Sequence, residues 1–256
     1  METTVAAQIA GWLSNAENAI VFTGAGISTE SGIPDFRSPD GIWNKFRTVY
    51  YDEFMASADA RHEYWRQKSI GHREFASAEP NAGHRVIAEW EEIGKIRGVI
   101  TQNIDGLHQL AGNHKVLELH GTARQIQCQD CGAPYDADPL IDEFLATDCV
   151  PMCRKCTDGR LKHATISFGQ QLPEDVLQKA VNWCQGADLL FAIGSSLVVS
   201  PAAELPAITK QQGGRLVIIN RDPTPLDEIA DIVVQESIGV VLTAIDRSYP
   251  DTAFDN

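Results

Sequence analysis

The sequence is poor in positive charge. Among its 256 residues, 21 lysines and arginines face 35 aspartates and glutamates, which leaves a net charge of −14 at pH 7. Proteins that bind nucleic acid need clustered lysine and arginine to neutralise phosphates, so this composition disfavours nucleic acid as a direct partner. The acidity weakly favours basic partners such as lysine-rich peptides, although its commonest effect is solubility.

The sequence also lacks a hydrophobic run long enough to cross a bilayer. The longest uncharged stretch late in the chain, 189–203, is too short for a span and is interrupted by the glycine and serines of 194–196. Near the amino terminus no cationic leader precedes an apolar segment, and Glu2 stands where a signal peptide would be positive. We therefore expect a soluble, cytoplasmic protein without a membrane partner.

No internal repeat, low-complexity tract or linker rich in proline, glycine and serine divides the chain. Short apolar runs alternate instead with longer helical segments, such as 84–93 and 174–185. Nearly continuous apolar runs are typical of parallel strands buried on both faces. The alternation predicts a doubly wound α/β sheet. The expected strands are 19–23, 98–101, 116–119, 188–193, 215–220 and 231–234.

Two stretches do not fit this alternation. Residues 35–81 are rich in aromatic side chains and helical in tendency, and residues 122–166 carry five of the six cysteines. We expect the first stretch to be a helical insertion and the second a metal-binding module, which together form a small domain. Residues 1–34, 82–121 and 167–256 then form the sheet domain.

Polar or glycine-rich segments follow five of the expected strands. They are GAGIS, QNIDGLH, His120 with Gly121, GSS and Asn220. Ligands of open α/β sheets bind outside the carboxyl ends of the strands. The five strand ends therefore predict one binding site.

The first of these segments begins Gly24-Ala25-Gly26-Ile27-Ser28-Thr29. It resembles the dinucleotide turn, in which glycines let backbone N–H groups approach a pyrophosphate at a helix N-terminus. Thr29 occupies the place of the third glycine, so a plain strand–helix turn is an equally good interpretation. No acidic residue follows at the distance usual in dehydrogenases, which disfavours ordinary hydride transfer.

The cysteines form two pairs of Cys-x-x-Cys spacing. Cys128 with Cys131, and Cys153 with Cys156, supply four thiolates for a tetrahedral zinc ion. Four thiolates leave no open position for water, so the metal is expected to be structural. Cys149 is a competing ligand, but its use would leave Cys156 idle.

His120 has three possible roles: zinc ligand, core histidine or catalytic base. The four cysteines already complete a zinc site, and His120 ends a strand outside the cysteine hairpin. An isolated histidine is more often a satisfied structural group. Because His120 shares its edge of the sheet with GAGIS and QNID, we interpret it as a base.

Two further segments carry polar side chains with a structural and a functional interpretation. Asn103 and Asp105 could form only an Asx turn, or they could bind a carboxamide and ribose hydroxyls. Arg37 could be a solvated loop charge, or its planar guanidinium could meet a diphosphate.

Taken together, these motifs resemble those of sirtuins, the NAD-dependent protein-lysine deacylases, over roughly residues 18–240. The matching segments are GAGISTESGIPDFRSPDGIW (24–43), TQNIDGLHQLAG (101–112), LHG (119–121), CQDC with CRKC, GSSLVVSPAAELP (194–206) and NRDPTPLD (220–227). The resemblance implies a Rossmann-like NAD-binding domain with NAD as co-substrate, one structural zinc, and acyl-lysine proteins or peptides as partners.

The resemblance also implies roles for individual residues. It makes His120, Asn103 and Asp105 catalytic, and Phe168, Gly169, Val198 and Val199 substrate-binding. The NAD-binding set that it implies is Gly24, Ala25, Gly26, Ser28, Thr29, Asp35, Phe36, Arg37, Gln102, Asn103, Ile104, Asp105, His120, Gly194, Ser195, Ser196, Asn220, Arg221, Asp222 and Ile238.

By the same resemblance, the acyl oxygen attacks the ribose carbon that bears nicotinamide, and nicotinamide leaves. His120 then acts as base on a ribose hydroxyl, and water completes deacylation to O-acyl-ADP-ribose and free lysine. A rival enzymatic reading is mono-ADP-ribosyl transfer to a protein nucleophile. A non-enzymatic reading is an NAD- or ADP-ribose-sensing module, which would have no use for a base.

The chain departs from the family pattern at several substrate-facing positions. Lys162-His163 stands where Arg-Pro is common, Gln170 follows Phe168-Gly169 where Glu is common, and Asp222 replaces a glutamate. Members that prefer succinyl or malonyl groups carry Tyr-x-x-Arg, whereas Tyr64 is followed at that spacing by Gln67. We therefore expect uncharged acyl groups to be preferred.

Overall fold

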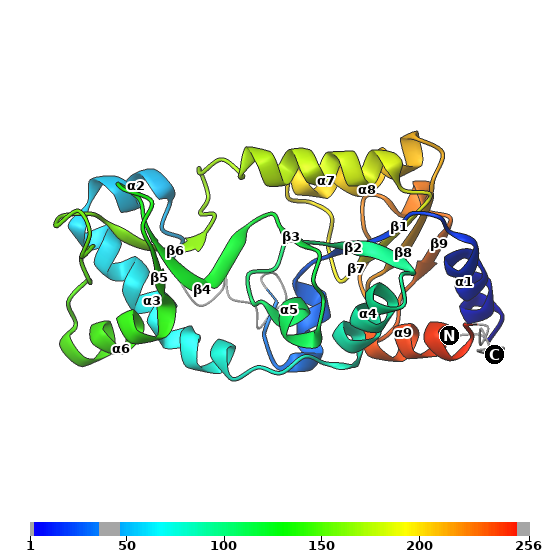
Figure 1. The fold of residues 1–256 in the computed structure, drawn as a ribbon, viewed down its shortest axis with the longest axis horizontal. Coiled ribbons are helices and arrows are strands. Elements are labelled where there is room, and N and C mark those ends of the chain that lie inside the picture. The colour runs from blue at the N-terminus through cyan, green and yellow to red at the C-terminus, as the bar shows by residue number, and fades with distance from the viewer. Residues whose placement is uncertain (1–2, 36–46, 250–256) are drawn as a thin grey trace.

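A parallel sheet forms the centre of the larger of two lobes in the computed structural model, which describes residues 3–35 and 47–249 (Figure 1). Its six strands lie in the order β3-β2-β1-β7-β8-β9. All six coincide with strands expected from the sequence, so the predicted α/β sheet is confirmed. The strands are β1 (Ala19–Thr23), β2 (Ile96–Thr101), β3 (Val116–Glu118), β7 (Leu189–Ile193), β8 (Arg215–Ile219) and β9 (Ile232–Val234).

The central strands are apolar because both of their faces are covered. Every residue of β1 and of β7 is buried. Alternate residues of β1 enter different cores: Val21 belongs to one apolar cluster, and Ile20 and Phe22 belong to another. This two-sided burial explains why the strands read as continuous apolar runs.

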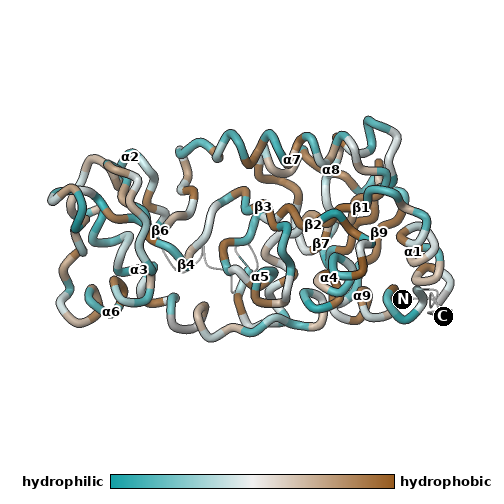
Figure 2. Tube along the Cα trace, viewed as in Figure 1, coloured by the Kyte–Doolittle hydropathy of each residue, from teal (hydrophilic) through white to brown (hydrophobic). Residues whose placement is uncertain are grey.

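Helices cover the two faces of the sheet. The first face packs against α1 (Thr3–Asn15), α4 (Ala82–Glu92) and α9 (Ile238–Arg247), and the second against α7 (Glu174–Gly186) and α8 (Leu205–Gln211). Figure 2 shows the apolar segments gathered in the sheet between these layers. The helix α5 (Leu107–Ala111) and the short 3-10 helices η1 (Ala25–Ser31), η3 (Ala202–Glu204) and η4 (Asp227–Ile229) connect the strands.

The smaller lobe is built on an antiparallel sheet of order β5-β4-β6. Its elements are α2 (Tyr51–Ala56), α3 (Ala58–Ala76), β4 (Gly121–Cys128), β5 (Pro134–Asp136), α6 (Ala137–Thr147) and β6 (Leu161–Thr165). Trp65 of α3, Ile126 of β4 and Phe144 of α6 share a third apolar cluster. The lobe therefore has a core of its own.

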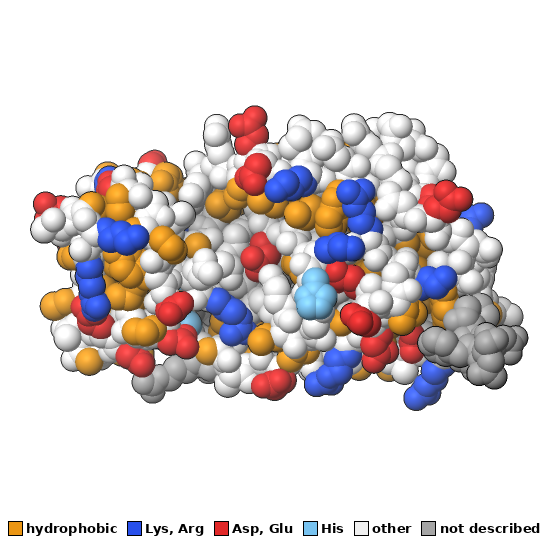
Figure 3. Space-filling model, viewed as in Figure 1, with side chains coloured by type: hydrophobic (Ala, Val, Ile, Leu, Met, Phe, Trp, Pro, Cys, Tyr) orange, Lys and Arg blue, Asp and Glu red, His pale blue; other side chains and the backbone are white. Residues whose placement is uncertain are grey.

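The surface is mixed in charge. Figure 3 shows acidic and basic side chains interspersed over both lobes on the face turned to the viewer. Within residues 3–35 and 47–249, no helix is both long and apolar enough to span a membrane.

Candidate active site

Glycines join the exits of β1 and β7. A Cβ atom on Gly24 would lie 2.8 Å from the carbonyl oxygen of Gly194, and one on Gly26 would lie 2.8 Å from the Cα of Gly194. The amide of Gly26 donates to the same carbonyl oxygen at 2.8 Å. The glycines thus allow two strand exits to touch. An α-helix does not follow, because residues Ala25–Ser31 form a 3-10 helix.

The exit of β2 carries Asn103 and Asp105, which are both buried. Ser28 links them: its hydroxyl donates to the Asp105 carboxylate at 2.7 Å and accepts from the Asn103 amide at 3.1 Å. Asp105 also accepts from the backbone N–H of Leu107 at 2.9 Å, so the Asx turn is real. The structural and functional interpretations of this segment are therefore compatible.

The buried hydroxyl groups of Thr101 and Thr23 form a hydrogen-bonded chain with the backbone of this segment. The backbone N–H of Asn103 donates to the hydroxyl of Thr101 at 3.0 Å, and Thr23 donates to the same hydroxyl at 2.8 Å. The ring Nε2 of His108 lies 3.0 Å from the Thr23 hydroxyl. Burial lowers the pKa of His108 to about 4, so this ring is neutral at pH 7.

His120 lies in the turn between β3 and β4. Its Nδ1 is 2.9 Å from the carbonyl oxygen of Gln102, and because a carbonyl only accepts, Nδ1 must carry the proton. The neutral ring then has its basic lone pair on Nε2. Burial lowers the pKa of His120, and the bond to Gln102 opposes this effect. A ring that is unprotonated at neutral pH suits a general base.

These strand exits open on one large cavity of about 1990 Å³ between the lobes. Gln102 and Ser195 connect the exits of β2 and β7 through a side-chain hydrogen bond of 2.7 Å. Every described residue of the NAD-binding set lines this cavity, including the distant Asn220, Arg221, Asp222 and Ile238. Phe36 and Arg37, also expected to bind NAD, lie outside the described residues.

Three of the four expected substrate-binding residues line the cavity, and one does not. Phe168, Gly169 and Val199 line the cavity. Val198 does not belong to the lining residues, and its side chain is exposed.

One face of α3 forms much of the small-lobe wall of the cavity, and from this face only Tyr64 and Gln67 were expected near the acyl group. Tyr64, Gln67, Lys68, His72 and Phe75 follow one face of α3 and line the cavity together with His163 and Thr165 of β6. Their spacing along α3 was a usable signal, because residues three and four apart share a helix face. Only the position of α3 relative to β6 shows that this face meets the cavity.

The basic residue next to Gln67 points elsewhere. Arg66 forms an ion pair with Glu63 at 2.7 Å and is not part of the cavity wall. Lys68 is a basic residue that does line the cavity. Its ammonium lies 5.7 Å from the centre of the Tyr64 ring.

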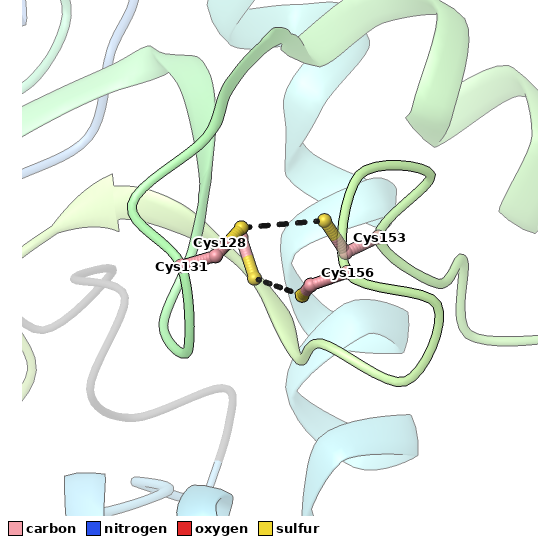
Figure 4. A group of neighbouring side chains, drawn as sticks. All are labelled: Cys128, Cys131, Cys153 and Cys156. Carbon is pink, nitrogen blue, oxygen red and sulfur yellow. Dashed lines mark hydrogen bonds between the residues drawn. The ribbon is translucent and has the colours of Figure 1, made fainter.

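The four predicted cysteine ligands meet in the small lobe (Figure 4). All their sulfur atoms lie within 4.8 Å of one another, and the Cys128–Cys156 and Cys131–Cys153 distances are both 3.7 Å. A tetrahedron with zinc–sulfur bonds of about 2.3 Å has sulfur–sulfur edges of about 3.8 Å, whereas a disulfide needs about 2.05 Å. The group therefore fits zinc.

A neighbouring glycine fits the same interpretation. A Cβ atom on Gly159 would overlap the sulfurs of both Cys128 and Cys156, so a side chain there would displace the ligands. Neither Cys149 nor His120 belongs to the group. The four cysteines expected as ligands therefore come together in a group that fits a structural zinc, and His120 lies outside this group.

Fold and site define a class: an α/β dinucleotide-binding fold with polar strand exits and an inserted four-cysteine module. The Sir2 family model matches residues 24–201, and the chain belongs to this family. An NAD-dependent protein deacetylase of Rhodopseudomonas palustris is 47% identical, with 92% of this chain and 93% of that protein covered.

Other relatives and solved structures agree. NAD-dependent protein deacylase 2 of Archaeoglobus fulgidus is 41% identical over 91% of each chain. A solved Sir2 complex with a p53 peptide and NAD+ is 38% identical, with a TM-score of 0.86 and coverage of 94% of this chain and 96% of that one. A propionylated-peptide complex of a Sir2 protein has a TM-score of 0.85 at 37% identity, covering 96% of this chain and 98% of that one.

Proposed function

We propose that this protein removes acetyl and related acyl groups from lysine side chains of proteins in an NAD-dependent reaction that releases nicotinamide and O-acyl-ADP-ribose. One observation carries the proposal most directly. His120 has its proton held on Nδ1 by Gln102, so Nε2 is free to act as a base in a cavity shared with Asn103 and Asp105. Family membership and the relatives' activities support it.

The proposed NAD site is the large-lobe side of the cavity, formed by the strand exits. NAD supplies a ribose carbon with nicotinamide as its leaving group. In this proposal Asp105 accepts a hydrogen bond from the carboxamide, beside Ile104. Asn103 holds the ribose and the attacking water with its amide, and His120 accepts a proton from a ribose hydroxyl at Nε2. Positioned acid–base groups contribute about 10²–10⁴ in rate.

The acyl-lysine is proposed to enter the cavity from the side of Phe168 and Val199, which present apolar walls. Phe168 is 44% exposed, and its ring lies 6.1 Å from that of Tyr50, so the entrance is lined by aromatic surface. Acylation removes the charge of lysine and leaves an apolar stem with an amide, which suits such walls better than free lysine would.

Two further proposals concern organisation. The domain boundaries expected from the sequence, with 35–81 and 122–166 as the inserted domain, are supported by the separate core that residues of both segments share.

A cytoplasmic location is supported by a four-thiol metal site, because reduced thiols persist in reducing compartments. Cell fractionation tests the location.

The test of the proposed activity is nicotinamide release from NAD in the presence of a panel of acyl-lysine peptides. Deacylation predicts release that depends on the peptide, with loss of the acyl mass from the peptide. An acceptor that gains the mass of ADP-ribose while the acyl group stays in place would support ADP-ribosyl transfer instead.

A further inference from the structure

Two consecutive residues of β4 hold the loop that follows β2. The backbone N–H of Ala123 donates to the carbonyl oxygen of Ile104 at 2.9 Å. Arg124 donates from Nε to the carbonyl oxygen of Asp105 at 2.7 Å. β4 continues from this point into the small lobe and ends at the metal-binding Cys128. The loop with the nicotinamide-binding candidates is thus attached to a small-lobe strand.

Gly106 allows Arg124 to come this close. Its φ is +71°, a left-handed conformation that favours glycine, and a Cβ atom there would lie 2.6 Å from Nε of Arg124. On the other side of the same peptide, the Asp105 carboxylate is fixed by Ser28 and by the N–H of Leu107. The Asp105–Gly106 peptide is therefore held from both lobes.

The guanidinium of Arg124 is itself held by the small lobe. It lies 5.9 Å from the ring centre of Phe75 on α3, a cation–π distance. Phe75 and Arg124 also line a crevice of about 310 Å³ beside the start of α6. Within the described residues, Nη2 is buried without a hydrogen-bond partner, while Nε makes the bond to the Asp105 carbonyl oxygen.

We propose that Arg124 is a positioning residue that ties the Asp105–Gly106 peptide to the small lobe and thereby sets the enzyme's affinity for nicotinamide. The inference rests on the proposed function, since it takes Ile104 and Asp105 as the nicotinamide-binding residues. Arg124 acts through the Asp105 carbonyl and does not line the large cavity. Replacement of Arg124 removes a hydrogen bond that holds the backbone at Asp105 and so loosens the orientation of the Asp105 carboxylate. The acyl-lysine entrance at Phe168 stays unchanged.

The test compares Arg124→Met and Arg124→Lys with the wild-type enzyme. Methionine keeps an unbranched apolar stem but removes the donor, and lysine keeps a cationic donor. We expect Arg124→Met to raise the inhibition constant of nicotinamide about three- to tenfold, the size of one lost hydrogen bond. The KM for the acyl-lysine peptide stays unchanged. Arg124→Lys should bind nicotinamide more tightly than Arg124→Met does. A general loss of stability in the Arg124→Met variant would not produce this recovery by a second cationic donor.

Arg61→Met is the matched control. Arg61 also belongs to the small lobe and donates to a backbone carbonyl, that of Phe54 at 3.0 Å, and its described hydrogen bonds do not reach the loop. Equal nicotinamide inhibition of Arg124→Met and wild type, or an equal shift in Arg61→Met, overturns the inference. If Arg124→Met does not fold, Gly106→Ala places a methyl group against Arg124, and an unchanged inhibition constant there overturns it too. A wild-type enzyme without acyl-dependent nicotinamide release refutes the proposed function instead.

Discussion

The two sheets of this protein are stabilised by different means. Among the residues that the structure describes, two apolar clusters enclose the parallel sheet and contain 36 buried residues (21 in one and 15 in the other). The antiparallel sheet has one cluster of 14 buried residues, and two of these are the metal-binding Cys128 and Cys153. We therefore expect the larger lobe to be stabilised mainly by apolar burial, and the smaller lobe to depend in addition on its metal.

The lobes also divide the chemistry. The side chains proposed to act on substrate, Asn103, Asp105 and His120, follow strands of the parallel sheet. The small lobe supplies the zinc site and the far wall of the cavity. Because the two kinds of residue lie on different sheets, stability and activity can be disrupted separately.

The largest effect is expected from removal of a zinc ligand. Cys156→Ser should unfold the small lobe, because structural zinc supplies an apparent ~10–16 kcal/mol of metal-linked folding energy in small modules. Hydrogen exchange should show lost protection in β4 and β6, with β1, β7 and β8 still protected. Cys149→Ser, the control, should keep stoichiometric zinc and full protection. A zinc-replete Cys156→Ser protein would show that the fourth ligand was chosen wrongly.

His120→Ala breaks the chemistry and leaves both lobes intact. Turnover should fall by about 10²–10⁴, the usual contribution of a positioned base. Zinc content and unfolding temperature should match the wild type, because His120 lies outside the cysteine group. His62→Ala, at a histidine on the surface of the small lobe, should leave turnover unchanged. Loss of zinc from His120→Ala would restore the ligand interpretation.

Acid should weaken the larger lobe through its buried histidines. Burial lowers the pKa of His84 to about 3 and that of His108 to about 4, below the ordinary value of about 6.5. As pH falls below ~6.5, these histidines become protonated in the unfolded chain while they stay neutral in the folded protein. The free energy of unfolding therefore decreases from pH ~6.5 down to the folded-state pKa values of about 4 for His108 and about 3 for His84. At pH 5 each histidine lowers the free energy of unfolding by about 2 kcal/mol relative to its value at pH 7.

This acid effect is best read from exchange of the β1 and β7 amides, since acid also protonates the zinc thiolates of the other lobe. Protection of these amides that stays constant between pH 7 and 5, after correction for the intrinsic exchange rate, would contradict the assignment to buried neutral histidines.

The smallest effect concerns the acyl group. Acetyl-lysine should be turned over about tenfold faster than succinyl-lysine, a difference of about 1.4 kcal/mol. Gln67 is neutral and its amide already donates to Glu63 at 2.6 Å, so it offers no cation to the succinyl carboxylate, and a buried carboxylate without a partner is costly. Lys68 offsets this only partly, because burial lowers its pKa.

The measurement is competition between acetyl and succinyl versions of one peptide at equal concentration. A specificity constant that favours the succinyl peptide would contradict the expectation. Loss of that preference in Lys68→Met would then identify the ammonium of Lys68 as the acyl-binding cation.

The sequence predicted the parts of the protein whose pattern is local. Continuous apolar runs identified all six parallel strands, and Cys-x-x-Cys spacing identified the metal group. The contact of Gly24 and Gly26 with Gly194 was not predicted, because it joins segments that are about 170 residues apart in the sequence. The cavity-facing Lys68 and His163 and the bond from Arg124 to Asp105 depend on how the lobes meet. No local pattern encodes that arrangement.

The central claim is NAD-dependent deacylation, and product analysis tests it most directly. An acetyl-lysine peptide is incubated with the protein and NAD, and all products are measured by mass spectrometry. We expect deacetylated peptide, nicotinamide and O-acetyl-ADP-ribose in equal amounts from the wild type, and deacetylated peptide and O-acetyl-ADP-ribose formed about 10²–10⁴-fold more slowly by His120→Ala. Nicotinamide released while the peptide keeps its acetyl group, with ADP-ribose attached to an acceptor, would contradict it.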